Sequence, residues 1–427
     1  MTGRVELGPG FGRVWFATGA TAVGAQMAQL ALPLLAVLSL HASSAAVGLL
    51  GAAPWVPFLL VSLPLGVLVD RRRRKPLLVT AEMVRGVATG VIILLGVTGL
   101  LTLPNLILLA VVTGCGTVLY EITYQSFLPS LVPRERLDAA NSRLQATQAT
   151  AVVAGPGLGG LLVQVLGALP TLGVTAAGSL LSALSLSRLP ESFTPPAARP
   201  EASARGEVGE GVRFLRDDRV LVGLLGYSAI SNLILQWVML LFLLDAVRRL
   251  QLAAGQVGLV LAIGALGTLL GAAASPAVSR RIRPLRLIVL TAVIDPTALL
   301  VLPAADPAWG VGMLVVVLGA AFGVNGFAAG LDTVVIATIR QRRIPDRLRG
   351  KVSAAGLMVA YGSIALGAAL GGGVGDLLGI RLGLALGCVG GLVATVWVIA
   401  WAVRITCHGD RLEEAPVGDA QAAGDRP

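Results

Sequence analysis

Long apolar runs alternate with short polar segments along the whole chain. Each run holds about twenty residues, and a helix rising about 1.5 Å per residue then crosses a hydrocarbon core of roughly 30 Å. The runs lack strict apolar–polar alternation and are about twice as long as a membrane strand, so they predict helices and not a β-barrel. Twelve spans are expected, at residues 14–38, 46–69, 77–99, 104–127, 139–163, 168–187, 219–244, 256–278, 286–303, 309–335, 352–374 and 380–403.

Composition agrees with a membrane protein. Of the 427 residues, 55% are hydrophobic and only 13% are charged, with a mean hydropathy of +0.83. Soluble domains carry about a quarter charged residues, so this chain has too little polar surface to cover a soluble body. The net charge of +10 comes from basic clusters between apolar runs. Such clusters are typical of loops facing an anionic membrane leaflet, and we expect no nucleic-acid partner.

The distribution of the 33 Lys and Arg residues predicts the topology. Alternate polar segments carry almost all of them, and only Arg248, Arg249 and Arg381 fall on the other side. The positive-inside rule therefore predicts that both termini and the central segment are cytoplasmic. Two cytoplasmic termini require an even number of spans, in agreement with twelve.

The two halves of the sequence repeat one another. The segments after the fourth and tenth expected spans align when Leu137 is matched to Leu348 and Ser142 to Ser353, both pairs being 211 positions apart. We therefore predict an all-α protein with a six-helix half at 1–188 and a second at 219–404. A cytoplasmic linker with a short amphipathic helix is expected at 189–218, and a disordered cytoplasmic tail at 405–427. Two such halves are typical of transporters that rock about a midplane site.

The loop after the second span carries a family signature. Gly66, Asp70, Arg74 and Lys75 match the pattern G-x-x-x-D-x-x-G-R-[RK], with Arg73 in place of the second glycine. The chain thereby resembles the major facilitator superfamily. The resemblance implies that Gly66 lets a neighbouring helix pack closely and that Asp70 meets the start of the eleventh span, which closes the cytoplasmic side. The alternative is a plain stop-transfer loop of arginines.

A second signature lies in the fifth span. Gly155, Pro156, Gly159 and Gly160 form G-P-x-x-G-G, which resembles drug–proton antiporters of this superfamily, with Ala151 at a position where that pattern has glycine. The nearest resemblance is to the macrolide-efflux and enterobactin-exporter branch, which implies a multi-pass protein of a bacterial plasma membrane. A bendable antiporter element and a glycine-rich packing face are both consistent with this pattern.

Other chemistry is not expected. The chain has no Walker loop, so ATP does not drive it, and its three cysteines and two histidines form no metal or redox pattern. The motif G-x-G-x-x-G within the fifth span follows no strand and is not a dinucleotide site. We predict no enzyme activity, no cofactor and no metal.

Acidic residues within the spans are the candidates for proton coupling. Glu121, Asp332 and Asp295 lie in the fourth, tenth and ninth spans, where an ionisable side chain suggests function. Burial favours the neutral form of a carboxyl group, so these groups could bind and release a proton. The alternative for each is a buried acid paired with a polar neighbour. Glu82 and Arg85, one turn apart, are interpreted as a structural pair near the cytoplasmic interface.

Uncharged polar residues in several spans predict a central cavity with apolar walls and a few polar contacts. The candidates are Gln26, Tyr124, Asn232, Gln236, Asn325 and Tyr361. The sequence thus predicts a monomeric secondary transporter, in contact with lipid, that exports a small amphipathic compound in exchange for protons. Such a compound would be an antibiotic, natural product or siderophore. An importer of the same fold and a non-transporting scaffold or sensor are the alternatives.

Overall fold

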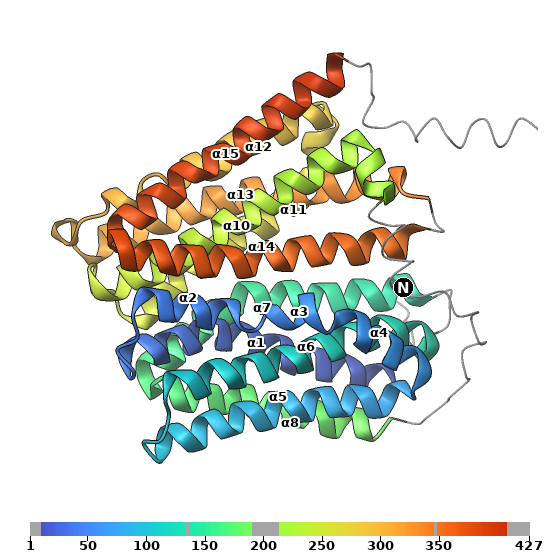
Figure 1. Ribbon diagram of the computed structural model, residues 1–427, viewed down its shortest axis with the longest axis vertical. Coiled ribbons are helices and arrows are strands. Elements are labelled where there is room, and N and C mark those ends of the chain that lie inside the picture. The colour runs from blue at the N-terminus through green and yellow to red at the C-terminus, as the bar shows by residue number, and fades with distance from the viewer. Residues whose placement is uncertain (1–9, 133–135, 190–212, 346–347, 408–427) are drawn as a thin grey trace, which may run out of the picture.

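The computed structural model describes residues 10–132, 136–189, 213–345 and 348–407, and these ranges are helical with no strand. The N-terminal half contains α1 (Phe11–Leu38), α2 (Ser44–Ala52), α3 (Val56–Leu60), α4 (Ser62–Arg71), α5 (Arg74–Val97), α6 (Leu103–Leu131), α7 (Leu137–Leu166) and α8 (Ala168–Ser187). The C-terminal half contains α10 (Arg219–Arg248), α11 (Ala254–Ser279), α12 (Pro284–Leu299), the short 3₁₀ helices η2 (Leu302–Ala304) and η3 (Pro307–Trp309), α13 (Val311–Arg343), α14 (Arg349–Leu378) and α15 (Ile380–Cys407). The all-α prediction is confirmed (Figure 1).

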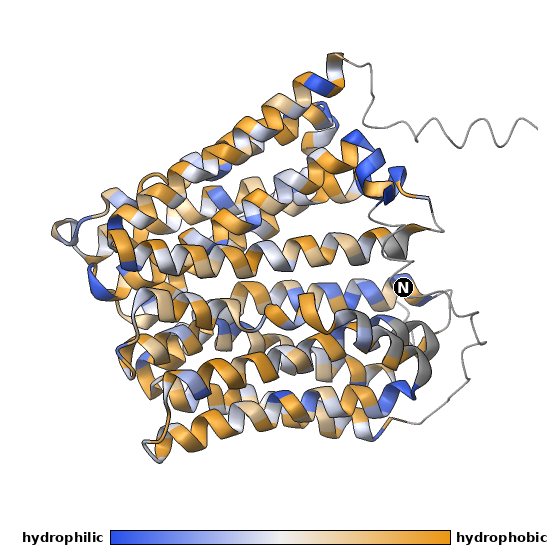
Figure 2. Cartoon of the chain, in the orientation of Figure 1, coloured by the Kyte–Doolittle hydropathy of each residue, from blue (hydrophilic) through white to orange (hydrophobic). Residues whose placement is uncertain are grey.

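Eleven helices of the described ranges are long and apolar enough to cross a membrane. Apolar residues cover them along most of their length (Figure 2). The expected second span is the exception, because it forms α2, α3 and α4 in place of one continuous helix. Pro54, Pro57 and Pro64 lie in this stretch. Proline removes a backbone donor and restricts the preceding residue, which accounts for the breaks.

The connection between the halves is only partly described. Residues 213–217 are helical and Leu215 is buried, whereas residues 190–212 of the predicted linker lie outside the described residues. The helix α15 continues to Cys407, three residues beyond the predicted boundary at 404. The remainder of the predicted tail is likewise outside the described ranges.

Backbone geometry displays the internal repeat. Positive φ angles occur at two non-glycine residues, His41 and Gln251, and at four glycines, Gly99, Gly167, Gly310 and Gly379. They pair as 41 with 251, 99 with 310 and 167 with 379, which are 210, 211 and 212 positions apart. Left-handed turns therefore recur at equivalent places, close to the 211-residue offset predicted from the sequence. All six lie in loops at one end of the bundle, here called the distal end; the opposite, proximal end carries the start of α1 and the end of α15 (Figure 1).

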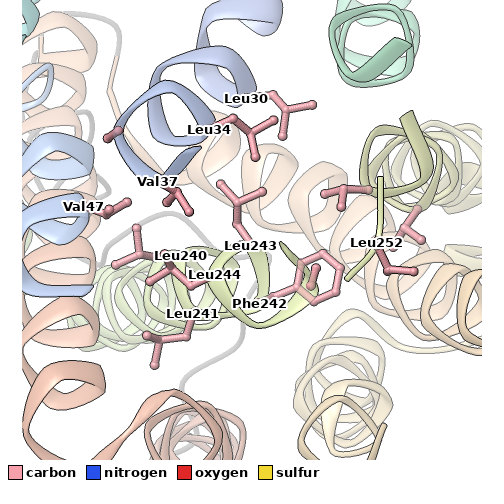
Figure 3. Packing of buried hydrophobic residues seen from close by; sticks show 14 of the residues in the cluster. Leu30, Leu34, Val37, Val47, Leu240, Leu241, Phe242, Leu243, Leu244 and Leu252 are labelled. Carbon is pink, nitrogen blue, oxygen red and sulfur yellow. The ribbon is translucent and has the colours of Figure 1, made fainter. Parts of the chain in front are cut away.

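The hydrophobic core is shared at the distal end and divided at the proximal end. The largest buried cluster joins Leu34 and Val47 of the N-terminal half to Leu241, Phe242 and Leu244 of α10 (Figure 3). Towards the proximal end, one cluster is confined to the N-terminal half, around Val14 and Leu78. Another is confined to the C-terminal half, around Leu224 and Val398. Within the described ranges, the halves are therefore joined most firmly at their distal ends.

Candidate functional site

Two acids of the C-terminal half share one buried region. Asp332 of α13 is 8% exposed, and the Tyr227 hydroxyl of α10 donates to its Oδ2 at 2.6 Å. Asp295 of α12 accepts from the amide of Asn325, at its side chain and at its backbone oxygen, the latter at 3.2 Å. The two carboxyl groups are close enough to interact electrostatically. The structure thus brings together three residues that the sequence marked separately: Asp295, Asp332 and Asn325.

The partners of these two acids are neutral, in contrast to those of other buried acids. Asp245 pairs with Arg249 at 2.7 Å and Asp218 pairs with Arg343 at 2.7 Å. Glu82 pairs with Arg85 at 3.4 Å. Within the described ranges, the hydrogen-bond partners of Asp295 and Asp332 are only hydroxyl and amide donors. A buried carboxylate without a cation is costly to ionise, so this pair is suited to binding a proton.

The Glu82–Arg85 pair of α5 is confirmed, and it is more deeply buried than the sequence suggested. Glu82 is fully buried, and the Thr21 hydroxyl of α1 donates to its Oε1 at 2.9 Å. In the described structure, Glu82 Oε2 and Arg85 Nε have no hydrogen-bond partner. This ion pair, in which two polar atoms lack a hydrogen bond, is a second polar centre. The sequence alone predicts only a structural pair near the interface.

Glu121 of α6 lies between that centre and the other half of the molecule. It interacts electrostatically with Arg85 and with Tyr361 of α14. Tyr120 and Tyr124 stack beside it with ring centroids 5.6 Å apart, and the Tyr124 hydroxyl has no hydrogen-bond partner among the described residues. Glu121 therefore lies near the boundary between the halves, whereas Asp332 is enclosed within one half.

An aromatic cluster joins the two halves at the break between α2 and α3. Tyr361 stacks on Trp55 with ring centroids 5.1 Å apart and lies 4.0 Å from the ring of Phe58. The break at Pro54 and Pro57 places both N-terminal rings against α14. In this conformation Tyr361 therefore has one face occupied by protein, where the sequence predicted a residue lining an open cavity.

The remaining cavity candidates do not join these clusters. Gln26 of α1 packs directly over Gly155 of α7. Asn232 and Gln236 are half-buried on α10. A small cavity between α10, α13 and α14 is lined by Ser228, Arg340 and Gly356, among other residues. Neither Asn232 nor Gln236 lines this cavity.

The predicted gating loop is described only in part. No described atom lies within 4 Å of a Cβ built on Gly66, so the close packing predicted there is absent. The reason is the separation of the halves at the proximal end. Arg73 adopts an extended conformation before α5, so the turn needs no glycine at that position. Lys75 donates to the Leu189 carbonyl at 2.7 Å, within the same half. The side chain of Asp70 lies outside the described set.

The glycine-rich signature of the fifth span packs against two different helices. Gly155 and Gly159 face Gln26 and Met27 of α1, within the N-terminal half. Gly160 faces Gly258 of α11, in the other half, and a Cβ at Gly160 would overlap the Ala254 carbonyl. The packing interpretation of this motif accounts for all of these contacts. Pro156 lies inside α7, which continues through it as a helix.

Comparison with known proteins establishes the family. A family model described as a transmembrane secretion effector matches residues 8–418, nearly the whole chain. The chain belongs to the major facilitator superfamily. It is a membrane transporter and not an enzyme, as predicted, and it falls in the enterobactin-exporter branch.

Curated relatives support the assignment, and solved structures share the fold. The chain is 28% identical over 310 residues to the enterobactin exporter EntS of Salmonella choleraesuis (strain SC-B67), covering 71% of each chain. It is 27% identical over 370 residues to EntS of Escherichia coli O1:K1 / APEC, covering 84% of each. Its fold is similar to a bacterial homolog of the lysosomal transporter Spinster in an inward-facing, occupied conformation, with a TM-score of 0.72 and 15% identity over 92% of this chain and 96% of that one. The nucleoside transporter NupG gives a TM-score of 0.72 and 13% identity over 92% of this chain and 99% of that one.

Proposed function

We propose that this transporter exports a small amphipathic compound in exchange for protons. The observation that carries the proposal is the Asp295–Asp332 pair, two buried acids whose hydrogen-bond partners among the described residues, Asn325, Tyr227 and Thr333, are all neutral donors. Two negative charges in one apolar region repel each other, so the pair is most stable with at least one proton bound. The proton would bind from one side of the membrane and be released on the other. Its release would drive the step that returns the transporter to its starting conformation.

The substrate-facing surface is amphipathic. Tyr361 and Trp55 present aromatic faces, and Glu121 and Tyr124 add polar groups near the boundary between the halves. Such walls suit a ligand that has both ring systems and polar groups. The related exporters carry enterobactin in their names, so a siderophore joins antibiotics and other natural products as a substrate class.

The conformation and the charge distribution support an orientation. Both termini are proposed to face the cytoplasm, because the basic clusters lie at the proximal end. The halves are separated there and joined distally. The structure would accordingly be an inward-facing state that loads its substrate from the cytoplasm.

Transport by the purified protein in liposomes tests the proposal. Enterobactin, the macrolide erythromycin and the dye ethidium would serve as probes under an imposed pH gradient. We expect at least one probe to move against its gradient towards the proton-rich side, and this movement to collapse with a protonophore. Probe transport that is unchanged by the protonophore would overturn proton coupling. Accumulation in the opposite direction would favour an importer, and no movement of a broader probe set would favour a scaffold or sensor.

A further inference from the structure

Two side chains cap helices of the opposite half at the distal end. Asp376 of α14 accepts a hydrogen bond from the backbone N–H of Ser44, the first residue of α2, at 3.2 Å. Gln164 of α7 accepts one from the backbone N–H of Gly255, at the start of α11, at 3.0 Å. The first N–H groups of a helix have no partner within it, and the helix dipole makes that end attractive to an oxygen acceptor.

The two contacts are copies of each other in the two repeats. Asp376 and Gln164 are 212 positions apart, and so are Gly372 and Gly160, one turn before them. Each of these glycines lies against a glycine of the capped helix: Gly372 against Gly48, and Gly160 against Gly258. The first two turns of α2 and α11 are thus held in the same way, by a close glycine contact and one side-chain cap from the other half.

From this symmetry we infer that Asp376 and Gln164 are positioning residues that hold the distal gate closed. The helix pairs α2–α14 and α7–α11 form much of the direct contact between the halves, and each cap lies at the distal edge of its pair. When the halves rock apart at this end, both caps must break together. The caps therefore stabilise the conformation that is open at the proximal end and do not contribute to the stability of either half alone.

The position of the caps makes them reversible. Asp376 and Gln164 are exposed, and Asp376 borders an open hollow lined by His41, Ser43 and Arg248. Water can enter and satisfy the freed N–H groups of α2 and α11 once the gate parts. Removing one cap should therefore shift the balance between the two conformations without unfolding the helix. Typical cap energies correspond to a shift of about fivefold in that balance, and two caps together to about twenty-fivefold.

Pulsed electron–electron double resonance, which measures the distance between two spin labels, tests the inference on the protein in nanodiscs without any substrate. Spin labels on Leu100→Cys and Leu382→Cys, both exposed at the distal end of different halves, report the separation there. Cys115, Cys388 and Cys407 are first replaced by serine. We expect Gln164→Ala and Asp376→Ala each to raise the long-distance population about fivefold, and the double variant to raise it further. Asp376→Asn and Gln164→Glu keep an oxygen acceptor. These variants should therefore retain most of the short-distance population that the alanine variants lose.

Matched controls separate a gate from ordinary helix capping. Gln256 caps the same helix α11 from its own half, at the backbone N–H of Ala253, and Asp306 caps η3 in the same way at Ala308. Gln256→Ala and Asp306→Ala should leave the distance distribution unchanged. An unchanged distribution in the Gln164→Ala/Asp376→Ala double variant would overturn the inference. An equal shift in the two controls would overturn it as well.

Discussion

A carboxylate inside a membrane-spanning helix needs either a cation or a proton for neutrality. Asp245 has Arg249, with both carboxylate oxygens hydrogen-bonded at 2.7 Å, so its charge is compensated within one helix. Among the described residues, Asp332 has the neutral donors Tyr227 and Thr333 as hydrogen-bond partners, and Asp295 lies nearby. The same side-chain type therefore has a structural role at one end of the C-terminal half and is suited to proton binding in its middle.

Asparagine at position 332 should uncouple transport from protons. Asp332→Asn keeps the size of the side chain and an acceptor for Tyr227, and it cannot bind or release a proton. We expect concentrative efflux of a transported probe to fall at least tenfold and the remaining flux to become insensitive to a protonophore, while probe binding persists. Asp245→Asn is the control, and it should lower the melting temperature because Arg249 loses its ion pair, with coupling per folded molecule intact.

Glu121 provides the competing site for the proton. It interacts with Arg85 in its own half and with Tyr361 in the other, so it is the acid nearest the boundary between the halves among the three sequence candidates. We expect Glu121→Gln to weaken probe binding about tenfold or less and to leave protonophore sensitivity in the residual flux. Loss of coupling in Glu121→Gln, with normal coupling in Asp332→Asn, would move the proton from the C-terminal half to the N-terminal half.

At the scale of the helices, close contact between the halves depends on glycine. Gly48 and Gly372 lie against each other, as do Gly160 and Gly258, and in each case a Cβ would overlap a carbonyl of the partner helix. Small residues permit such approach in membranes, where packing and not the hydrophobic effect holds helices together. The glycines of the fifth-span signature allow such close approach to both α1 and α11.

Alanine at position 160 should open the distal gate. Gly160→Ala forces α7 away from Ala254 of α11, so the closed contact is lost although alanine favours the helix by about 1 kcal/mol. We expect the label pair at Leu100 and Leu382 to move to the longer distance and efflux to fall severalfold. Gly173→Ala in α8 is the control, since nothing lies within 4 Å of a Cβ there. An equal effect of both variants would mean that the contact itself does not matter.

The sequence predicted the individual helices better than the contacts between them. Span positions follow from local hydrophobicity, which needs no tertiary knowledge, and the repeat followed from matching Leu137 with Leu348. Three prolines were visible in the second span, yet length and hydropathy alone do not show that the helix breaks there. The contact between Asp376 and Ser44, 332 positions apart, could not be predicted from local sequence. The grouping of Asp295 with Asp332 likewise depends on how α12 packs on α13.

At the scale of the whole molecule, orientation decides which conformation the structure represents. The separated cores lie at the end that carries the basic clusters, and the shared core lies at the end with few cations. If the termini are cytoplasmic, the protein is open to the cytoplasm and sealed towards the outside by the gate at Asp376 and Gln164. With the opposite orientation, this conformation would be an outward-open state, and the direction inferred for transport would be reversed.

Cysteine labelling in intact cells tests this orientation directly. Cysteines at Ser203 in the linker and Glu413 in the tail, both outside the described residues, should resist a membrane-impermeant maleimide in intact cells and react after permeabilisation. Leu100→Cys, in the exposed distal loop between α5 and α6, should react in intact cells. The background lacks Cys115, Cys388 and Cys407, so each signal has one source. The positive-inside rule demands this pattern, because reversing it would place nearly all of the arginines on the outer surface. Reaction at Ser203 or Glu413 from outside, with protection at Leu100, would invert the topology and with it the assignment of the sealed end as the outer gate.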